Sequence, residues 1–203
     1  MKNEHIDRTI PFYNLILKCK NYKSSQINLK PGYSFKNYEN GDENSWSKLE
    51  YEIGDFDSLN EAKEYFLNSY CVNNEIYKRC FFIINSKDEI VGSCIAWKDK
   101  KKNKYVSSLH WLVVSQNERN QGLGKALCQK VLDFFYKEHG FPVYIHTQPW
   151  SYKAILLYIN LGFKIQIRDT FGKYENEYEK SMKTLKSIIP KEQYEKLKFN
   201  SEE

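Results

Sequence analysis

The sequence contains no long hydrophobic run. None of its apolar stretches approaches the roughly 18 residues that a membrane-spanning helix needs. The first ten residues, MKNEHIDRTI, carry acidic side chains and no apolar segment of the secretory type. Internal repeats and low-complexity tracts are also missing, while 41% of the 203 residues are hydrophobic and 16% are aromatic. We therefore expect one globular, cytoplasmic α/β domain with no membrane contact.

Patterns typical of metal sites and disulfide frameworks are missing as well. The cysteines are five, an odd number, and none is spaced C-x-x-C; the four histidines show no ligand spacing. We expect reduced cysteines in apolar positions and no metal. These residues are Cys19, Cys71, Cys80, Cys94, Cys128, His5, His110, His139 and His146.

The charge is mild, with a formal net value of +5 from 31 basic and 26 acidic residues. No basic stripe with interleaved aromatic residues is present, which argues against a nucleic-acid partner. A small positive excess would still favour a polyanionic ligand through long-range attraction.

The most informative stretch runs from Leu109 to Leu127, LHWLVVSQNERNQGLGKAL. Nearly every position from 109 to 114 is apolar or aromatic, which predicts a β-strand buried on both faces. A polar turn over 115–121 follows. Gly122 and Gly124 then open a segment whose apolar residues recur at helical spacing up to Gly140.

A strand, a turn and a glycine-rich helix start form a suitable cradle for an anion. The first N–H groups of a helix have no partner within the helix, and the helix dipole adds partial positive charge there. Glycine lets a phosphate approach the backbone closely. The spacing excludes G-x-x-x-x-G-K-[ST], and Leu127 stands where a third glycine of G-x-G-x-x-G would be. An ordinary strand-to-helix turn is the alternative.

Two motifs in this region resemble one family. Residues 119–124, RNQGLG, resemble the [QR]-x-x-G-x-[GA] pyrophosphate loop of the GNAT superfamily of N-acetyltransferases. Residues 154–163, AILLYINLGF, resemble its A-x-x-L-Y-x-x-x-G-F signature, with one helix and one expected strand (141–147) between the motifs. The resemblance implies the GNAT α/β (α+β) fold, a mixed central sheet flanked by helices. It places a GNAT domain at 31–170, an N-terminal extension at 1–30 and a helical C-terminal extension at 171–203.

The resemblance also implies acetyl-CoA as cosubstrate. In the family, the pantetheine arm lies in a split between two strands, here 109–114 and 143–147. Its amides pair with the backbone of the first strand, and its pyrophosphate lies on the loop. Ser151 stands where many members have an asparagine that contacts the pantetheine. The implied cofactor-binding residues are Leu112, Val113, Val114, Arg119, Asn120, Gln121, Gly122, Leu123, Gly124, Lys125 and Ser151.

Two residues are candidates for proton transfer. Attack on the thioester needs a neutral amine, and deprotonating an alkylammonium at pH 7 costs on the order of 4–5 kcal/mol. His110 resembles a strand histidine of the arylalkylamine branch and is the candidate base; many members instead have a glutamate at the position of Ser108, which shares a strand face with His110. A structural histidine or a water chain is the alternative. Tyr158 resembles the general acid, or else is a core tyrosine.

The implied reaction is acetyl transfer to a primary amine of a small molecule in a ternary complex. A protein lysine or N-terminal acetyltransferase and a non-catalytic acyl-CoA-binding module are the alternatives. Acceptor choice is expected from the helices near residues 41–77. Their aromatic residues either line the pocket or pack the helices on the sheet, and they are Trp46, Tyr51, Phe56, Tyr65, Phe66 and Tyr70. We expect a monomer or a homodimer.

The remaining pattern predicts several local elements. A capping box at Ser58 and Glu61 begins a helix, and 79–85 with 90–98 form a hairpin. The charged segment 99–104 is expected to be a solvated loop. Residues 9–18 are expected to form an added strand or an extended segment. Residues 165–170 are expected to continue a strand, and 175–189 to form a helix that Pro190 ends.

Overall fold

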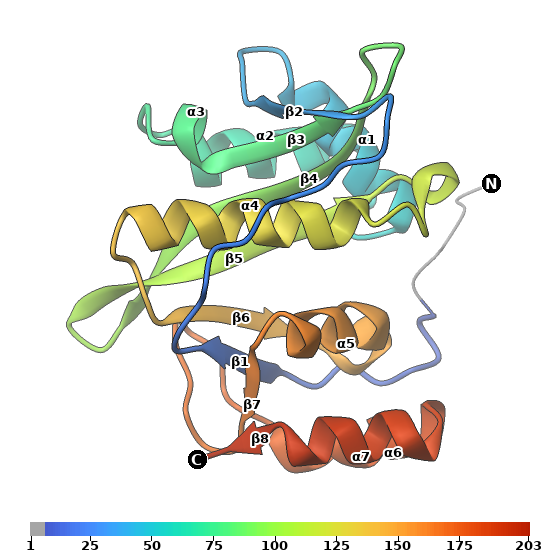
Figure 1. Ribbon diagram of the computed structural model, residues 1–203, viewed down its shortest axis with the longest axis vertical. Coiled ribbons are helices and arrows are strands. Elements are labelled where there is room, and N and C mark those ends of the chain that lie inside the picture. The colour runs from blue at the N-terminus through green and yellow to red at the C-terminus, as the bar shows by residue number, and fades with distance from the viewer. Residues whose placement is uncertain (1–6) are drawn as a thin grey trace. The chain divides into compact units, whose positions relative to one another are not determined.

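The computed structural model describes residues 7–203. The first six residues of the expected N-terminal extension, with His5, lie outside the described residues. Within 7–203, eight strands pair in the order β2-β3-β4-β5-β6-β1-β7-β8, with both antiparallel and parallel neighbours. This mixed sheet with its helices confirms the predicted α/β (α+β) fold (Figure 1).

The strands are β1 (Leu15–Cys19), β2 (Ser34–Asn37), β3 (Cys80–Ile84), β4 (Ile90–Lys101), β5 (Lys104–Val114), β6 (Val143–Thr147), β7 (Lys164–Gln166) and β8 (Ser201–Glu202). The α-helices are α1 (Glu43–Ile53), α2 (Leu59–Tyr70), α3 (Ile76–Arg79), α4 (Leu123–Lys137), α5 (Tyr152–Asn160), α6 (Tyr178–Ile188) and α7 (Lys191–Phe199). Short 3₁₀ turns are η1 (Gln116–Glu118) and η2 (Pro149–Ser151). Among residues 7–203, no helix has both the length and the apolar composition of a membrane span.

The chain folds as two compact units. One contains residues 25–96 and 111–134, and the other contains residues 7–24, 97–110 and 135–203. Strands β4 and β5 each contribute residues to both units. The three-part division expected from the sequence stays a prediction.

In the first unit, α1 packs against α2, and local signals set the connection between them (Figure 1). Gly54 ends α1 in the left-handed conformation, with φ of 89°, which glycine adopts without a Cβ clash. The Ser58 side chain accepts a hydrogen bond from the Glu61 N–H at 3.1 Å, as predicted. The Glu61 carboxylate accepts from the Asp57 N–H at 2.9 Å instead of from Ser58, so the capping box is shifted by one residue.

Aromatic side chains form the core under these two helices. Trp46, Phe56, Phe66 and Tyr70 are buried, so they pack the helices rather than face solvent. Trp111 of β5 meets the ring of Trp46 edge-on at 5.5 Å, and its indole N–H donates to the Tyr70 hydroxyl at 2.7 Å. This cluster fixes the position of β5 in the unit.

In the second unit, β1 lies between β6 and β7 and is antiparallel to both. The expected strand 9–18 is observed later, at Leu15–Cys19. Pro11 has no N–H for a ladder, and the N–H of Asn14 donates to the Glu177 carboxylate at 3.0 Å. Pro190 caps α7, and the chain then forms β8, which pairs with β7 in parallel. The expected strand 165–170 is only three residues long, Lys164–Gln166.

The prediction of a solvated loop at 99–104 is wrong. Strand β4 continues to Lys101 and β5 begins at Lys104, so only Lys102 and Asn103 form the turn. The physical reason is that two of the charged side chains find partners within the second unit. Asp99 is bound by residues of β5, and Lys101 is paired with Asp169.

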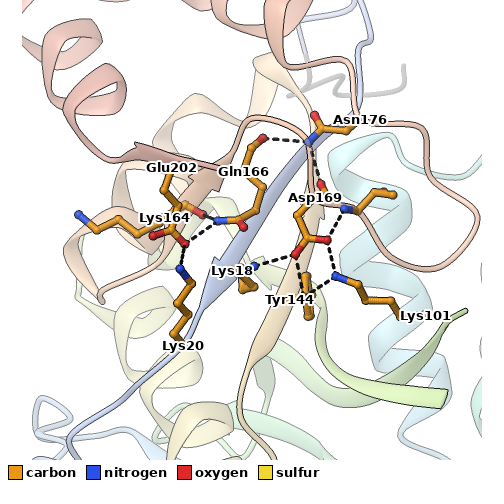
Figure 2. Close-up of polar contacts among 10 residues, drawn as sticks. Lys18, Lys20, Lys101, Tyr144, Lys164, Gln166, Asp169, Asn176 and Glu202 are labelled. Carbon is orange, nitrogen blue, oxygen red and sulfur yellow. Dashed lines mark hydrogen bonds and ion pairs between the residues drawn. The ribbon is translucent and has the colours of Figure 1, made fainter.

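Asp169 is the centre of the polar network shown in Figure 2. Its carboxylate accepts hydrogen bonds from Lys18 Nζ at 2.7 Å and from the Tyr144 hydroxyl at 3.0 Å, and it is also paired with Lys101. Lys101 donates to the Tyr144 hydroxyl at 2.7 Å. Burial opposes ionisation, but these donors outweigh it and hold the pKa of Asp169 well below its usual value. The network ties the segment after β7 to β1, β4 and β6.

Candidate active site

The turn between β5 and α4 has the backbone of an anion site. Asn120 and Gly122 both adopt positive φ, 63° and 81°. A Cβ built at Gly122 would meet no heavy atom within 4 Å, so the space beside this backbone is open. The first helical hydrogen bond runs from the Ala126 N–H to the Gly122 carbonyl at 3.1 Å, and the preceding N–H groups have no acceptor within the helix. The residues therefore fit a diphosphate.

Side chains hold this turn against the segment that precedes β2. The Tyr33 hydroxyl donates to the Glu118 carboxylate at 2.6 Å, and Lys30 Nζ donates to the Gln121 side chain at 2.7 Å. Arg119 and Lys125 are exposed. The one acidic side chain of the turn is thus engaged by a neutral hydroxyl, while two basic side chains extend into solvent.

Strand β5 is less buried than the sequence predicts. Leu109 and Val113 are buried, but His110, Leu112 and Val114 are only half-buried, so the strand is not covered on both faces. Trp111 has φ of 51°, a conformation that is rare for a bulky side chain, and it interrupts the extended run. Within the described chain, parallel pairing of β5 with β6 covers Ser107 and Ser108. Pairing thus ends just before the stretch expected to carry the pantetheine.

His110 lies in a small polar cluster within the second unit. Its Nε2 is 2.7 Å from Oδ2 of Asp99, and the Ser108 hydroxyl donates to the same oxygen at 2.6 Å. Ser108 and His110 thus reach one carboxylate from the same face of β5. Burial opposes ionisation of Asp99, but the bonds from His110 and Ser108 outweigh it and hold its pKa below the usual value.

A second histidine lies near this cluster. His146 of β6 has Nε2 2.7 Å from the side-chain oxygen of Asn14, and its ring stacks on Tyr174 with centroids 3.7 Å apart. Burial, together with the nearby charge of His110, lowers the pKa of His146 to about 4. His146 is therefore a neutral, structural imidazole at neutral pH.

Tyr158 and Ser151 both belong to the second unit. Tyr158 is buried on α5, and its ring lies 5.8 Å from that of Phe163. Ser151 ends η2 just before α5, and its hydroxyl accepts from the Gln148 side chain at 3.1 Å. The predicted site residues are thus distributed: the loop 119–125 and residues 112–114 lie in the first unit, and His110, Ser151 and Tyr158 lie in the second.

Sequence reasoning missed Asp99. Its neighbours are lysines, so the segment looked like a solvated turn. A signal was present, because Trp97, Asp99 and Lys101 continue the period-2 alternation of the preceding strand. Across residues 7–203, no group of three or more His, Cys, Asp or Glu side chains is arranged to hold a metal ion.

Comparison with known families decides the assignment. Residues 42–163, more than half of the chain, match the model of the acetyltransferase (GNAT) family. The chain belongs to the GNAT family. This segment contains the hairpin, β5, the glycine turn, α4, β6 and α5, so the two motifs found in the sequence lie inside it.

Individual relatives agree with this assignment. N-acetyltransferase family 8 member 3 of Mus musculus is 33% identical over 107 residues, which are 52% of this chain and 47% of that protein. N-acetylaspartate synthetase of Xenopus tropicalis is 33% identical over 85 residues, 42% of this chain and 31% of that protein. The chain spans less than half the length of these relatives. A crystal structure of the NatC complex bound to Gag peptide and CoA shares the fold, with a TM-score of 0.54 and 21% identity, covering 68% of this chain and 87% of that one.

Proposed function

We propose that this GNAT protein is an acetyl-CoA-dependent N-acetyltransferase that acts on a primary amine of a small molecule, by direct attack in a ternary complex. The observation that carries the proposal is the open backbone at Gly122, where α4 begins. It lies inside the segment that matches the family. A helix start with this geometry binds the diphosphate of a coenzyme.

The chain's own groups then have separate roles. The N–H groups around Gly122, Leu123 and Gly124 bind the diphosphate, and Asn120 and Gln121 shape the turn. Arg119 and Lys125 add positive charge. The backbone of Leu112, Val113 and Val114 pairs with the pantetheine amides, and the Leu112 N–H stabilises the developing oxyanion. Acetyl-CoA, when bound, supplies the acetyl group as an activated thioester.

Two side chains move the protons. His110 takes one proton from the acceptor's ammonium group, and the freed lone pair forms the N–C bond as the C–S bond breaks. The sulfur leaves with the bonding electron pair and receives a proton from Tyr158. The second proton of the attacking nitrogen then passes to the Tyr158 oxygen, so that the products are the amide, the free thiol and one proton held by His110. Tyr158 is buried on α5, and its phenol O–H is the proton donor proposed for this step.

The binding half of the proposal is tested by thermal unfolding with acetyl-CoA. A ligand at 100 times its Kd stabilises the native state by about 2.7 kcal/mol, so Tm rises. Gly124→Glu places bulk and negative charge at the helix start and abolishes the shift. Asn103→Glu adds the same charge in the exposed β4–β5 turn and serves as the matched control. No shift for wild type at millimolar ligand contradicts the proposal.

The acceptor is tested with a panel of amines, polyamines, amino sugars and peptides, read by release of free thiol. The name of N-acetylaspartate synthetase supports a small acceptor. The NatC structure holds a peptide, which supports the alternative of a protein acceptor. Acetylation of peptides alone would select that alternative, and binding without any turnover would select a non-catalytic acyl-CoA-binding module. The cytoplasmic location and a monomeric or homodimeric state stay predictions.

A further inference from the structure

We infer that Asp99 is a positioning residue that fixes the proton of His110 on Nε2 and so makes Nδ1 the nitrogen that accepts the acceptor's proton. This inference rests on the proposed function, because it assigns an atom to the base of that reaction. It adds a residue, Asp99, that the sequence motifs do not contain.

The geometry is that of a hydrogen bond to one carboxylate oxygen. Oδ2 of Asp99 lies 2.7 Å from His110 Nε2 and 2.6 Å from the Ser108 hydroxyl oxygen. The side chains of Asp99 and His110 are 23% and 17% exposed, which keeps water from replacing their hydrogen bond easily. The Ser108 hydroxyl donates a hydrogen bond to Oδ2 of Asp99 and so holds this oxygen in a fixed direction.

The charge of Asp99 decides which partner donates. Its pKa lies below the usual value, so the carboxylate is ionised at neutral pH and can only accept. Nε2 of His110 must then carry the hydrogen. A neutral imidazole has one N–H and one lone pair, so the lone pair is on Nδ1.

The neighbouring titratable groups agree with this assignment. Asp99 of β4 and His146 of β6 both interact with His110. His146 stays neutral above about pH 5, because its pKa is lowered to about 4. When His110 takes up a proton, the resulting imidazolium faces the Asp99 carboxylate and not a second cation.

The first test needs no activity. Long-range ¹H–¹⁵N NMR of wild type at pH 8 reports the tautomer of His110. We expect the Nε2–H tautomer. In Asp99→Asn the new amide can either donate or accept, so the preference for the Nε2–H tautomer is lost. An Nδ1–H tautomer in wild type, or an unchanged tautomer preference in the variant, overturns the inference. If Asp99→Asn does not fold, the wild-type tautomer still decides.

The second test uses the pH profile of kcat/KM. Asp99→Asn moves the acidic limb to lower pH and lowers the plateau by about tenfold, because the base is weaker. The KM for acetyl-CoA is unchanged, since the cofactor residues are intact. Asp169→Asn is the matched control, with the same substitution at a carboxylate of the same unit, and its acidic limb stays in place. An unmoved limb in Asp99→Asn overturns the inference. Failure of the proposed function shows separately, as no acetyl transfer by wild type.

Discussion

Asp99 and Asp169 lie in the same unit, and each carboxylate accepts hydrogen bonds from side chains of neighbouring strands. Their donors differ in chemistry. Asp169 faces two lysines and a tyrosine (Figure 2). Asp99 faces a histidine and a serine.

This difference separates a structural centre from a functional one. Burial and the nearby Asp169 raise the pKa of Tyr144 to about 12, and the donors around Asp169 lower the pKa of its carboxyl group. This pair therefore keeps one protonation state over the physiological range and has a structural role. Histidine is a side chain that serves in general acid–base chemistry, so the Asp99 cluster can have a functional role. Substitutions at the two centres should therefore change different measured quantities.

The largest expected effect is on catalysis, at the Asp99 centre. His110→Ala removes the base, and general-base catalysis contributes about 10²–10⁴-fold. We expect kcat/KM to fall by that order and the acidic limb of its pH profile to flatten. Tm should change little, since His110 is only half-buried. Steady-state kinetics from pH 5 to 9 measure this, and an unaltered limb would remove His110 from the mechanism.

The next effect is on stability, at the Asp169 centre. Asp169→Asn leaves Lys18 and Lys101, 12% and 21% exposed, without their carboxylate, which costs about 3 kcal/mol. Folding lowers the pKa of Asp169. Its contribution to the free energy of unfolding is therefore complete above pH 3.8 and is lost as the pH falls below that value.

Urea unfolding at pH 7 and pH 3 measures the contribution of Asp169. The deficit of the variant should shrink at the lower pH. The acidic limb of kcat/KM should stay where it is in wild type. An acidic limb that shifts in Asp169→Asn would contradict the separation of the two centres, because the Asp169 network would then also affect the base, His110.

The sequence was sufficient to predict most helices and strands, but it was insufficient to predict which polar side chains contact each other between strands. The change from period-2 alternation to helical spacing at Gly122 predicts a strand, turn and helix, and the structure has them. Ser58 predicts the start of α2 through its hydroxyl. These signals are local, because each depends on residues within one turn or one strand.

Partners between strands depend on the folded register, which one sequence does not reveal. Asp99 looked like part of a solvated charge run, and its contact with His110 exists only after β4 and β5 are placed together. Trp111 adopts a left-handed conformation that local propensity does not predict, and its ring there packs against Trp46 and donates to Tyr70. The roles proposed for His110 and Tyr158 came from family resemblance rather than from spacing.

A smaller effect is expected at His146, which lies beside the functional centre but behaves as a structural group. Its pKa falls from 6.5 to about 4 on folding, so its neutral form is favoured in the native state. His146 does not change the free energy of unfolding above pH 6.5. As the pH falls towards 4 it lowers that free energy, because His146 binds a proton in the unfolded chain before it does so in the folded one. His146→Gln keeps a partner for Asn14 and removes this loss.

The His146→Gln variant should therefore lose less stability than wild type between pH 7 and pH 4.5, by about 2 kcal/mol. Chemical denaturation at both pH values measures the difference. Equal losses in the two proteins would show that His146 takes up its proton without unfolding. That result would place His146 with the titrating centre of Asp99 and would weaken the contrast between the two centres.

The smallest effect is expected at the Tyr144 hydroxyl. It donates to Asp169 at 3.0 Å and accepts from Lys101 at 2.7 Å, and burial, with Asp169 nearby, raises its pKa to about 12. Tyr144→Phe keeps the ring, over which Lys101 Nζ lies 4.5 Å from the centroid, and leaves both lysines paired with Asp169. One lost hydrogen bond costs about 1 kcal/mol. Urea unfolding should show that deficit with kcat/KM unchanged, whereas a deficit as large as that of Asp169→Asn would mean that the hydroxyl, and not the lysines, holds the carboxylate in place.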